Sequence, residues 1–170
     1  MEFPELIFGS DKAYLNTRIE IADFFLEHKR QLSDIMLAGS RIRNIYKRLE
    51  PFFDNFTGPI CGKCPDPCCV NRHGFPDFED LVLFQAMGTR PPDFNCMVNN
   101  TETCQFLSPG GCILPRHGRS YRCTWYFCDS CMDEFHNKQR AEYEKFKALM
   151  KRLSKKRILL LERFEKEWFA

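Results

Sequence analysis

The residues of this chain that are best suited to chemistry are its ten cysteines, all of which fall between positions 61 and 131. Thiols at this density form disulfides, bind metal ions or perform redox reactions. Because the rest of the sequence has none, their clustering indicates that one local structure uses them together. They are Cys61, Cys64, Cys68, Cys69, Cys96, Cys104, Cys112, Cys123, Cys128 and Cys131.

The N-terminal residues help to choose among these uses. Positions 1–5 read M-E-F-P-E, with acids and a proline where a secretory signal has a basic start and a long apolar stretch. We therefore expect a cytoplasmic protein with reduced thiols, and we favour metal binding over a disulfide scaffold. No apolar run approaches the roughly 20 residues of a spanning helix, so no membrane span is expected.

Two C-x-x-C pairs, Cys61 with Cys64 and Cys128 with Cys131, carry the strongest local signal. The loop of such a pair lets two sulfurs converge on one metal, so the two pairs are suited to a tetrahedral zinc site. The same thiolates are equally suited to an iron–sulfur cluster. A helix predicted to begin near Ser130 would place Cys128 and Cys131 at its positive end, which favours thiolates and would make a metal-free Cys131 nucleophilic.

Three histidines, His73, His117 and His136, flank the cysteines. An imidazole can ligate zinc, or it can donate a hydrogen bond to a metal-bound sulfur. A histidine in such a position is more often a surface residue or a hydrogen-bond partner than a ligand, so none of the three is assigned to the metal.

Three arginines, Arg116, Arg119 and Arg122, lie beside Cys112 and Cys123 in the sequence. Their side chains could hold an anionic substrate, or they could neutralise a site that is rich in thiolates. We expect neutralisation, because buried negative charge needs a partner of opposite sign.

Four motifs follow one another in the cysteine-rich segment. They are the C-x-x-C-x-x-x-C-C run at 61–69, C-Q-F-L at 104–107, G-G-C-I-L at 110–114 and R-S-Y-R-C at 119–123, with Cys128 five residues further on. In this combination the chain resembles the YkgJ-type cysteine-cluster proteins, a family also described as a zinc- or iron-chelating domain. It departs from the family pattern by one extra residue before the paired cysteines and by a serine where the last motif of the family has a proline.

The resemblance covers about residues 61–128 and implies that the chain binds metal, either zinc or iron. An iron–sulfur redox function is a common description of the family. Cys96 and Cys131 are spare and are weaker candidates, and the spacing leaves open whether the other cysteines fill two four-thiolate sites or one cluster and a structural metal. The eight predicted metal ligands, which match family positions, are Cys61, Cys64, Cys68, Cys69, Cys104, Cys112, Cys123 and Cys128.

The segments on both sides of the cysteines predict long helices. In 11–50, apolar residues recur every three or four positions, as a buried helical stripe requires, and the same pattern runs through 132–170. Gly39 falls close to the first stripe and marks a close helix contact, a kink or a break. Between the helices, 51–131 is rich in proline and glycine and predicts an irregular core with one short helix and a small β-hairpin near 106–114.

These elements predict a single domain, 1–170, that is mainly α-helical, with an irregular cysteine-rich metal-binding core flanked by two long helices. We expect an iron–sulfur cluster, [4Fe–4S], in an electron-transfer or redox role. The main alternative is a zinc-binding structural or interaction module without catalysis of its own, and a third is an enzyme that uses Cys96 or Cys131 as a catalytic thiol. The net charge of +2 does not indicate nucleic acid. The redox or protein partner and a homodimer through the long helices stay open.

Overall fold

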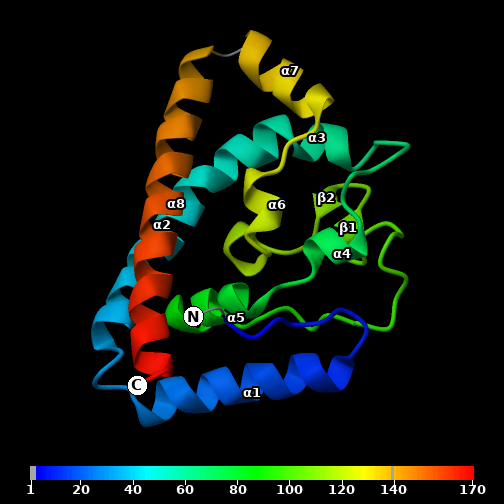
Figure 1. Cartoon of the computed structure of the whole chain (residues 1–170). Coiled ribbons are helices and arrows are strands. Elements are labelled where there is room, and N and C mark those ends of the chain that lie inside the picture. The colour runs from blue at the N-terminus through cyan, green and yellow to red at the C-terminus, as the bar shows by residue number, and fades with distance from the viewer. Residues whose placement is uncertain (1–2, 139) are drawn as a thin grey trace.

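Helices account for most of the chain in the computed structural model, which describes residues 3–138 and 140–170 (Figure 1). The mainly α-helical fold with a short inner helix and a small antiparallel hairpin is confirmed. In chain order the elements are α1 (Asp11–Glu27), α2 (Ser33–Phe56), α3 (Gly58–Cys61), α4 (Asn71–Gly74), α5 (Phe78–Ala86), β1 (Leu107–Ser108), β2 (Gly111–Cys112), the 3-10 turn η1 (Arg116–Gly118), α6 (Arg122–Trp125), α7 (Asp129–Lys138) and α8 (Arg140–Trp168).

The predicted N-terminal helical segment consists of two helices that meet at an angle, with a turn at residues 28–32 between them (Figure 1). α1 begins where the Ser10 hydroxyl accepts a hydrogen bond from the backbone N–H of Ala13 at 3.1 Å, as an N-cap does. α2 continues through Pro51, beyond the predicted end at residue 50. Proline removes one helical hydrogen bond, but the turn that follows buries Phe53 and Phe56, and this burial offsets the loss.

The hydrophobic core is built mainly by α2 packing along α8, with α1 and α5 completing it (Figure 1). Gly39 lies where α2 meets α5, and a Cβ atom there would stand only 2.2 Å from the carbonyl oxygen of Ala86. This glycine therefore marks a close helix contact, one of the three predicted outcomes. The buried side chains of this core include Ile42, Leu49, Leu153, Leu160 and Phe164.

A buried carboxylate on α5 connects this core to the cysteine-rich segment. Asp80 forms a capping box with Asp77 and also accepts a hydrogen bond from the backbone N–H of Tyr121 at 2.9 Å. From α8, Arg157 forms an ion pair with Glu79, and its guanidinium carbon lies 4.3 Å from the centre of the Tyr121 ring. These contacts fix the chain just before α6 relative to two helices of the core.

The helix predicted over 132–170 is divided into α7 and α8, and residue 139 between them lies outside the described residues. The Phe135 ring of α7 lies 4.9 Å from the Phe146 ring of α8 and 4.1 Å from the Phe56 ring of α2, measured between centroids. These aromatic contacts hold the start of α7, and its cysteines, against the end of α2. Among the described residues, no helix has the length and apolar character needed to cross a membrane.

Candidate metal centre

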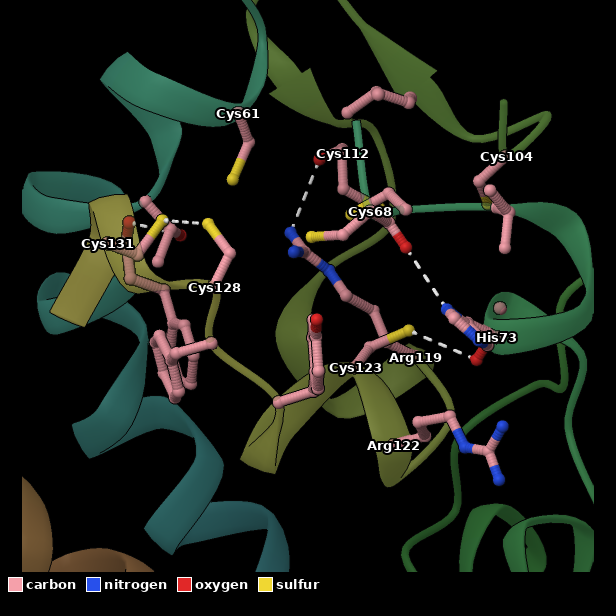
Figure 2. A pocket seen from close by; sticks show the side chains of 18 of the residues that line it. Cys61, Cys68, His73, Cys104, Cys112, Arg119, Arg122, Cys123, Cys128 and Cys131 are labelled. Atoms are coloured by element: carbon pink, nitrogen blue, oxygen red, sulfur yellow. Dashed lines mark hydrogen bonds between the residues drawn. The ribbon is translucent and has the colours of Figure 1, made fainter. Parts of the chain in front are cut away.

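Eight of the ten cysteines line one cavity of about 290 Å³, to which Phe53 of α2 also contributes (Figure 2). All ten cysteines are free thiols in this structure. Seven of the eight predicted ligands are in the lining, and Cys131 joins them. The lining cysteines are Cys61, Cys68, Cys69, Cys104, Cys112, Cys123, Cys128 and Cys131.

Short elements bring these thiols together from distant parts of the sequence. α3, which follows α2 directly, carries Cys61 at its end, and α7 begins beside Cys128. The hairpin supplies Cys112 from β2, and α6 supplies Cys123. An isolated antiparallel bridge joins Val70 to Thr103. It brings Cys68 and Cys69, which precede Val70, close to Cys104, which follows Thr103.

Two glycines allow the backbone to approach this closely. In the first C-x-x-C loop, a Cβ atom on Gly62 would stand 2.1 Å from the carbonyl oxygen of Pro109 in the hairpin turn. In α4, a Cβ atom on Gly74 would stand 2.9 Å from the Sγ atom of Cys104. At Gly62 a side chain would collide with backbone, whereas at Gly74 it would push the Cys104 thiol aside. The first glycine is required by the loop contact, and the second leaves the thiol its place.

Four of the thiols form what we call the tight group, which is held together by sulfur–sulfur contacts. The Cys128 thiol donates to Cys131 over an Sγ–Sγ distance of 3.6 Å, and Cys131 is also the hydrogen-bond partner of Cys61. That partnership is the main cause of a lowered pKa of Cys61 and of a raised pKa of Cys131. Burial, and then its neighbour Cys128, raise the pKa of Cys68. The tight group is Cys61, Cys68, Cys128 and Cys131.

The other four thiols form what we call the wide group, whose hydrogen bonds run to groups other than thiols. Cys123 Sγ lies 3.2 Å from the Ser120 hydroxyl and 3.7 Å from the carbonyl oxygen of His73. The backbone N–H of Cys104 donates to the carbonyl oxygen of Cys69 at 2.8 Å. Burial raises the pKa of Cys69 to about 12 and that of Cys104 to about 11, so both thiols hold their protons at neutral pH. The wide group is Cys69, Cys104, Cys112 and Cys123.

Two of the three predicted arginines lie beside the cysteines and donate hydrogen bonds to backbone carbonyl oxygens near the thiols. Arg119 places its guanidinium among the labelled cysteines in Figure 2 and donates to the carbonyl oxygens of Leu114 at 2.8 Å and Cys112 at 3.3 Å. Arg116 is buried, lies over the Phe53 ring at 3.5 Å and donates to the Cys123 carbonyl oxygen at 3.1 Å. This placement supports the prediction that the arginines neutralise the site. Arg122 lines the cavity but is exposed.

The two remaining cysteines lie away from the cavity. Cys64, a predicted ligand, directs its thiol to the carbonyl oxygen of Asp66 at 3.3 Å and is absent from the lining. Cys96, the weakest candidate, is buried in the hydrophobic core, where its backbone N–H donates to Asp11 at 2.7 Å. The sequence motif alone could not show that the second cysteine of the first C-x-x-C pair turns away, whereas that of the second pair, Cys131, turns inward.

The predicted histidines have different positions. His73 lines the cavity, and its Nδ1 atom lies 3.1 Å from the carbonyl oxygen of Cys68, so it acts as a hydrogen-bonding neighbour of the thiols. His117 belongs to η1 and is not in the cavity lining. The side chain of His136 lies outside the described part of the chain.

Sequence reasoning did not identify Ser120 as a functional residue. Its hydroxyl contacts Cys123 Sγ and donates to the carbonyl oxygen of His73 at 3.0 Å, so it joins α6 to α4 beside a thiol. The only signal in the sequence is the departure from the proline of the family motif, a residue without a side-chain donor.

The donor set fits a thiophilic metal, although the thiols are not yet arranged around one. Soft thiolates select zinc or iron–sulfur clusters over hard cations. Within the described residues, no three histidine, cysteine or acidic side chains already form a group that could hold an ion. Binding therefore requires the thiols to lose their protons and turn toward the metal, as is usual for thiolate sites.

Comparisons with known proteins identify no relative of this chain. No family model, no curated protein and no solved structure matches it. The resemblance to the cysteine-cluster family therefore remains a prediction from the motifs, and function must be argued from the cavity.

Proposed function

We propose that this chain is a metalloprotein of the YkgJ type that holds an iron–sulfur cluster, [4Fe–4S], and acts in cytoplasmic electron transfer or redox chemistry. The observation that carries the proposal is the convergence of eight free thiols on one cavity. A single zinc ion takes four ligands, so this number of thiols exceeds one zinc site. Two buried or half-buried arginines beside the thiols supply the opposite charge that a thiolate-rich site needs.

The residues around the thiols suit a cluster whose potential is controlled by the protein. Phe53, Leu107 and Phe127 add apolar surface to the lining, which restricts water. Hydrogen bonds and solvent exposure at the sulfurs set the potential of such clusters. When bound, the cluster would supply reversible one-electron transfer. Trp125 and Tyr126, which line the cavity and are about half exposed, lie at its solvent side.

The test is a visible spectrum combined with iron, sulfide and zinc analysis of protein purified without oxygen. We expect a brown protein with several irons per chain. Cys96→Ser is the matched control and should keep its colour, because Cys96 lies outside the cavity. A colourless protein that holds only zinc, or no metal, would contradict the proposal.

The zinc-binding module is the second candidate, and one observation favours it. The Cys128 and Cys131 sulfurs are 3.6 Å apart, close to the edge of about 3.8 Å in a tetrahedron with zinc–sulfur bonds of about 2.3 Å. By contrast, the third candidate loses support, because the pKa values of Cys131 and Cys96 are raised and Cys96 is buried. A catalytic thiol needs the opposite combination of a low pKa and access to substrate.

A further inference from the structure

The geometry points to two separate sites in the cavity: the tight group binds a single zinc ion, and the wide group binds the iron–sulfur cluster. This inference rests on the proposed function and divides the eight cavity thiols between two metals. It assigns Cys131 as a ligand and excludes Cys64, which reverses the order of preference given by the sequence motif.

The spacing within the tight group suits a single ion. Four thiolates around one zinc ion lie about 3.8 Å apart, because all of them share the same metal at about 2.3 Å. The 3.6 Å between Cys128 and Cys131 already has this length. In a [4Fe–4S] cluster each thiolate binds a different iron, so the sulfurs lie farther apart than around one ion.

The other two members complete this group from separate elements. Cys61 at the end of α3 is the hydrogen-bond partner of Cys131, and Cys68 is a hydrogen-bond partner of Cys128. The four thiols thus form a continuous chain of contacts, Cys61 to Cys131 to Cys128 to Cys68. Cys128 directly precedes α7 and Cys131 lies in its first turn, so one short segment supplies both thiols of the second C-x-x-C pair.

The wide group has the features of a cluster site. Cys123 Sγ contacts the Ser120 hydroxyl and the carbonyl oxygen of His73. Among the described residues no hydrogen bond joins two thiols of this group, so an intervening cluster breaks none. Pairing of the Cys69 and Cys104 backbones fixes two of its members relative to each other. Arg119 donates to the carbonyl oxygen of a third, Cys112, and places positive charge beside the group.

The adjacent pair Cys68 and Cys69 provides the link between the two sites. Cys68 interacts with Cys128 and Cys61 of the tight group. Cys69 accepts a backbone hydrogen bond from Cys104 of the wide group. Cys69 also lies near Cys68 and Cys61, so the pair stands where the two groups meet. In this proposal the two consecutive residues serve different metals. The charge is also consistent, because a divalent ion with four thiolates keeps surplus negative charge that Arg116 and Arg119 oppose.

The test compares zinc and iron content in single variants purified without oxygen. Cys131→Ser should lose its zinc, from about one ion per chain to a small fraction, and keep its iron and brown colour. Cys104→Ser should show the reverse, with iron and colour lost and zinc kept. Cys64→Ser is the matched control for Cys131→Ser, since each is the second cysteine of a C-x-x-C pair, and it should retain both metals.

The outcomes separate this inference from the proposed function. If the wild type binds iron but Cys131→Ser and Cys104→Ser lose the same metals together, the division is wrong while the function stands. If Cys64→Ser behaves like Cys131→Ser, the ligand assignment is wrong. A wild type without iron removes the proposed function itself, whatever the variants show.

A second measurement tests the tight group without depending on assembly of the cluster. In metal-free protein carrying Cys104→Ser and Cys112→Ser, Co²⁺ should bind once, with the absorption of a tetrahedral thiolate site. Adding Cys131→Ser should weaken this binding by more than about 100-fold, because loss of a ligand exceeds the 10–100-fold cost of losing an outer partner. Adding Cys64→Ser instead should leave Co²⁺ binding unchanged. If Cys64→Ser and Cys131→Ser weaken Co²⁺ binding equally, the assignment of Cys131 in place of Cys64 as a ligand is wrong.

Discussion

At the residue scale, the cavity depends on positions where a side chain is absent as much as on the thiols themselves. Gly62 lets the first C-x-x-C loop touch the hairpin turn, and Gly74 lets α4 lie against the Cys104 sulfur. A side chain at position 62 would meet the Pro109 backbone, and one at position 74 would displace the Cys104 sulfur. These glycines therefore influence how closely the segments that carry cysteines approach one another.

We predict that Gly74→Ala lowers the iron content by about half or more, because its methyl group would displace a cluster ligand. The new Cβ atom would stand 2.9 Å from Cys104 Sγ. Gly110→Ala is the control, since the nearest atom to its Cβ would be the Ser108 hydroxyl at 3.8 Å. Iron and zinc analysis of the two variants measures the effect, and equal iron in both would show that the Cys104 position is not critical.

The sequence predicts the candidate site in outline, and the exceptions have a physical cause. The resemblance to the cysteine-cluster family selected seven of the eight lining cysteines, and the eighth, Cys131, was a weaker candidate. The roles of Cys64 and Cys131 could not be predicted, because the direction of each thiol depends on whether its loop meets the hairpin or the end of α2. Ser120 was missed for the same reason: its contact with His73 joins two segments that are distant in the sequence.

At the element scale, the contact between α2 and α5 positions the cysteine-rich segment that follows α5. We predict that Gly39→Ala destabilises the protein by about 1–3 kcal/mol, as overpacking does, because its Cβ would collide with the backbone of Ala86. Ser40→Ala, at the next and exposed position of the same helix, should change stability little. Chemical denaturation followed by circular dichroism measures both, and equal stability would contradict the close contact.

The capping box of α5 should make stability depend on pH. Burial is the main cause of the raised pKa of Asp80. A carboxyl with a raised folded-state pKa contributes most stability below its unfolded value of 3.8, and this contribution is lost as the pH rises through the folded value. The side chain introduced by Asp80→Asn stays neutral and can still accept the hydrogen bond from the Tyr121 N–H. The difference in unfolding free energy, variant minus wild type, should therefore increase as the pH rises.

The measurement is the difference in unfolding free energy between Asp80→Asn and wild type from about pH 5 to pH 8, where we expect an increase on the order of 1 kcal/mol. Only the slope is diagnostic, because the lost bond from the Asp77 N–H shifts both ends equally. Asp34→Asn, on the exposed face of α2, is the control and should give no slope. A flat difference for Asp80→Asn would show that Asp80 is charged in the folded protein.

Periodicity predicts where helices form but not how they are divided. The apolar stripe of residues 11–50 continues across the turn at 28–32, so the break between α1 and α2 leaves no clear mark in the sequence. Pro51 suggested a helix end, yet the buried rings of Phe53 and Phe56 extend α2 past it. In both cases packing of the core decides the outcome over local preference.

At the scale of the whole molecule, two regions are stabilised in different ways. α1, α2, α5 and α8 share one hydrophobic core that contains most of the buried apolar side chains. The segments around the cavity consist instead of two-residue strands and four-residue helices. Their facing side chains are largely thiols. We therefore expect the core to fold without metal and, if the proposed function holds, the cavity segments to depend on bound metal to hold their thiols in place.

We predict that removing the metal with a chelator under reducing conditions opens the cavity segments and leaves the long helices folded. Amide hydrogen exchange in 61–74 and 104–131 should accelerate by at least about tenfold, because few buried contacts restrain these segments, while α2 and α8 stay protected. The same protein with its metal bound is the control. Equal loss of protection in all helices would mean that the metal supports the entire fold, and unchanged exchange everywhere would mean that the thiols need no metal to keep their places. Only the selective result fits a helical core that is folded without metal and a thiol cavity that becomes ordered when metal binds.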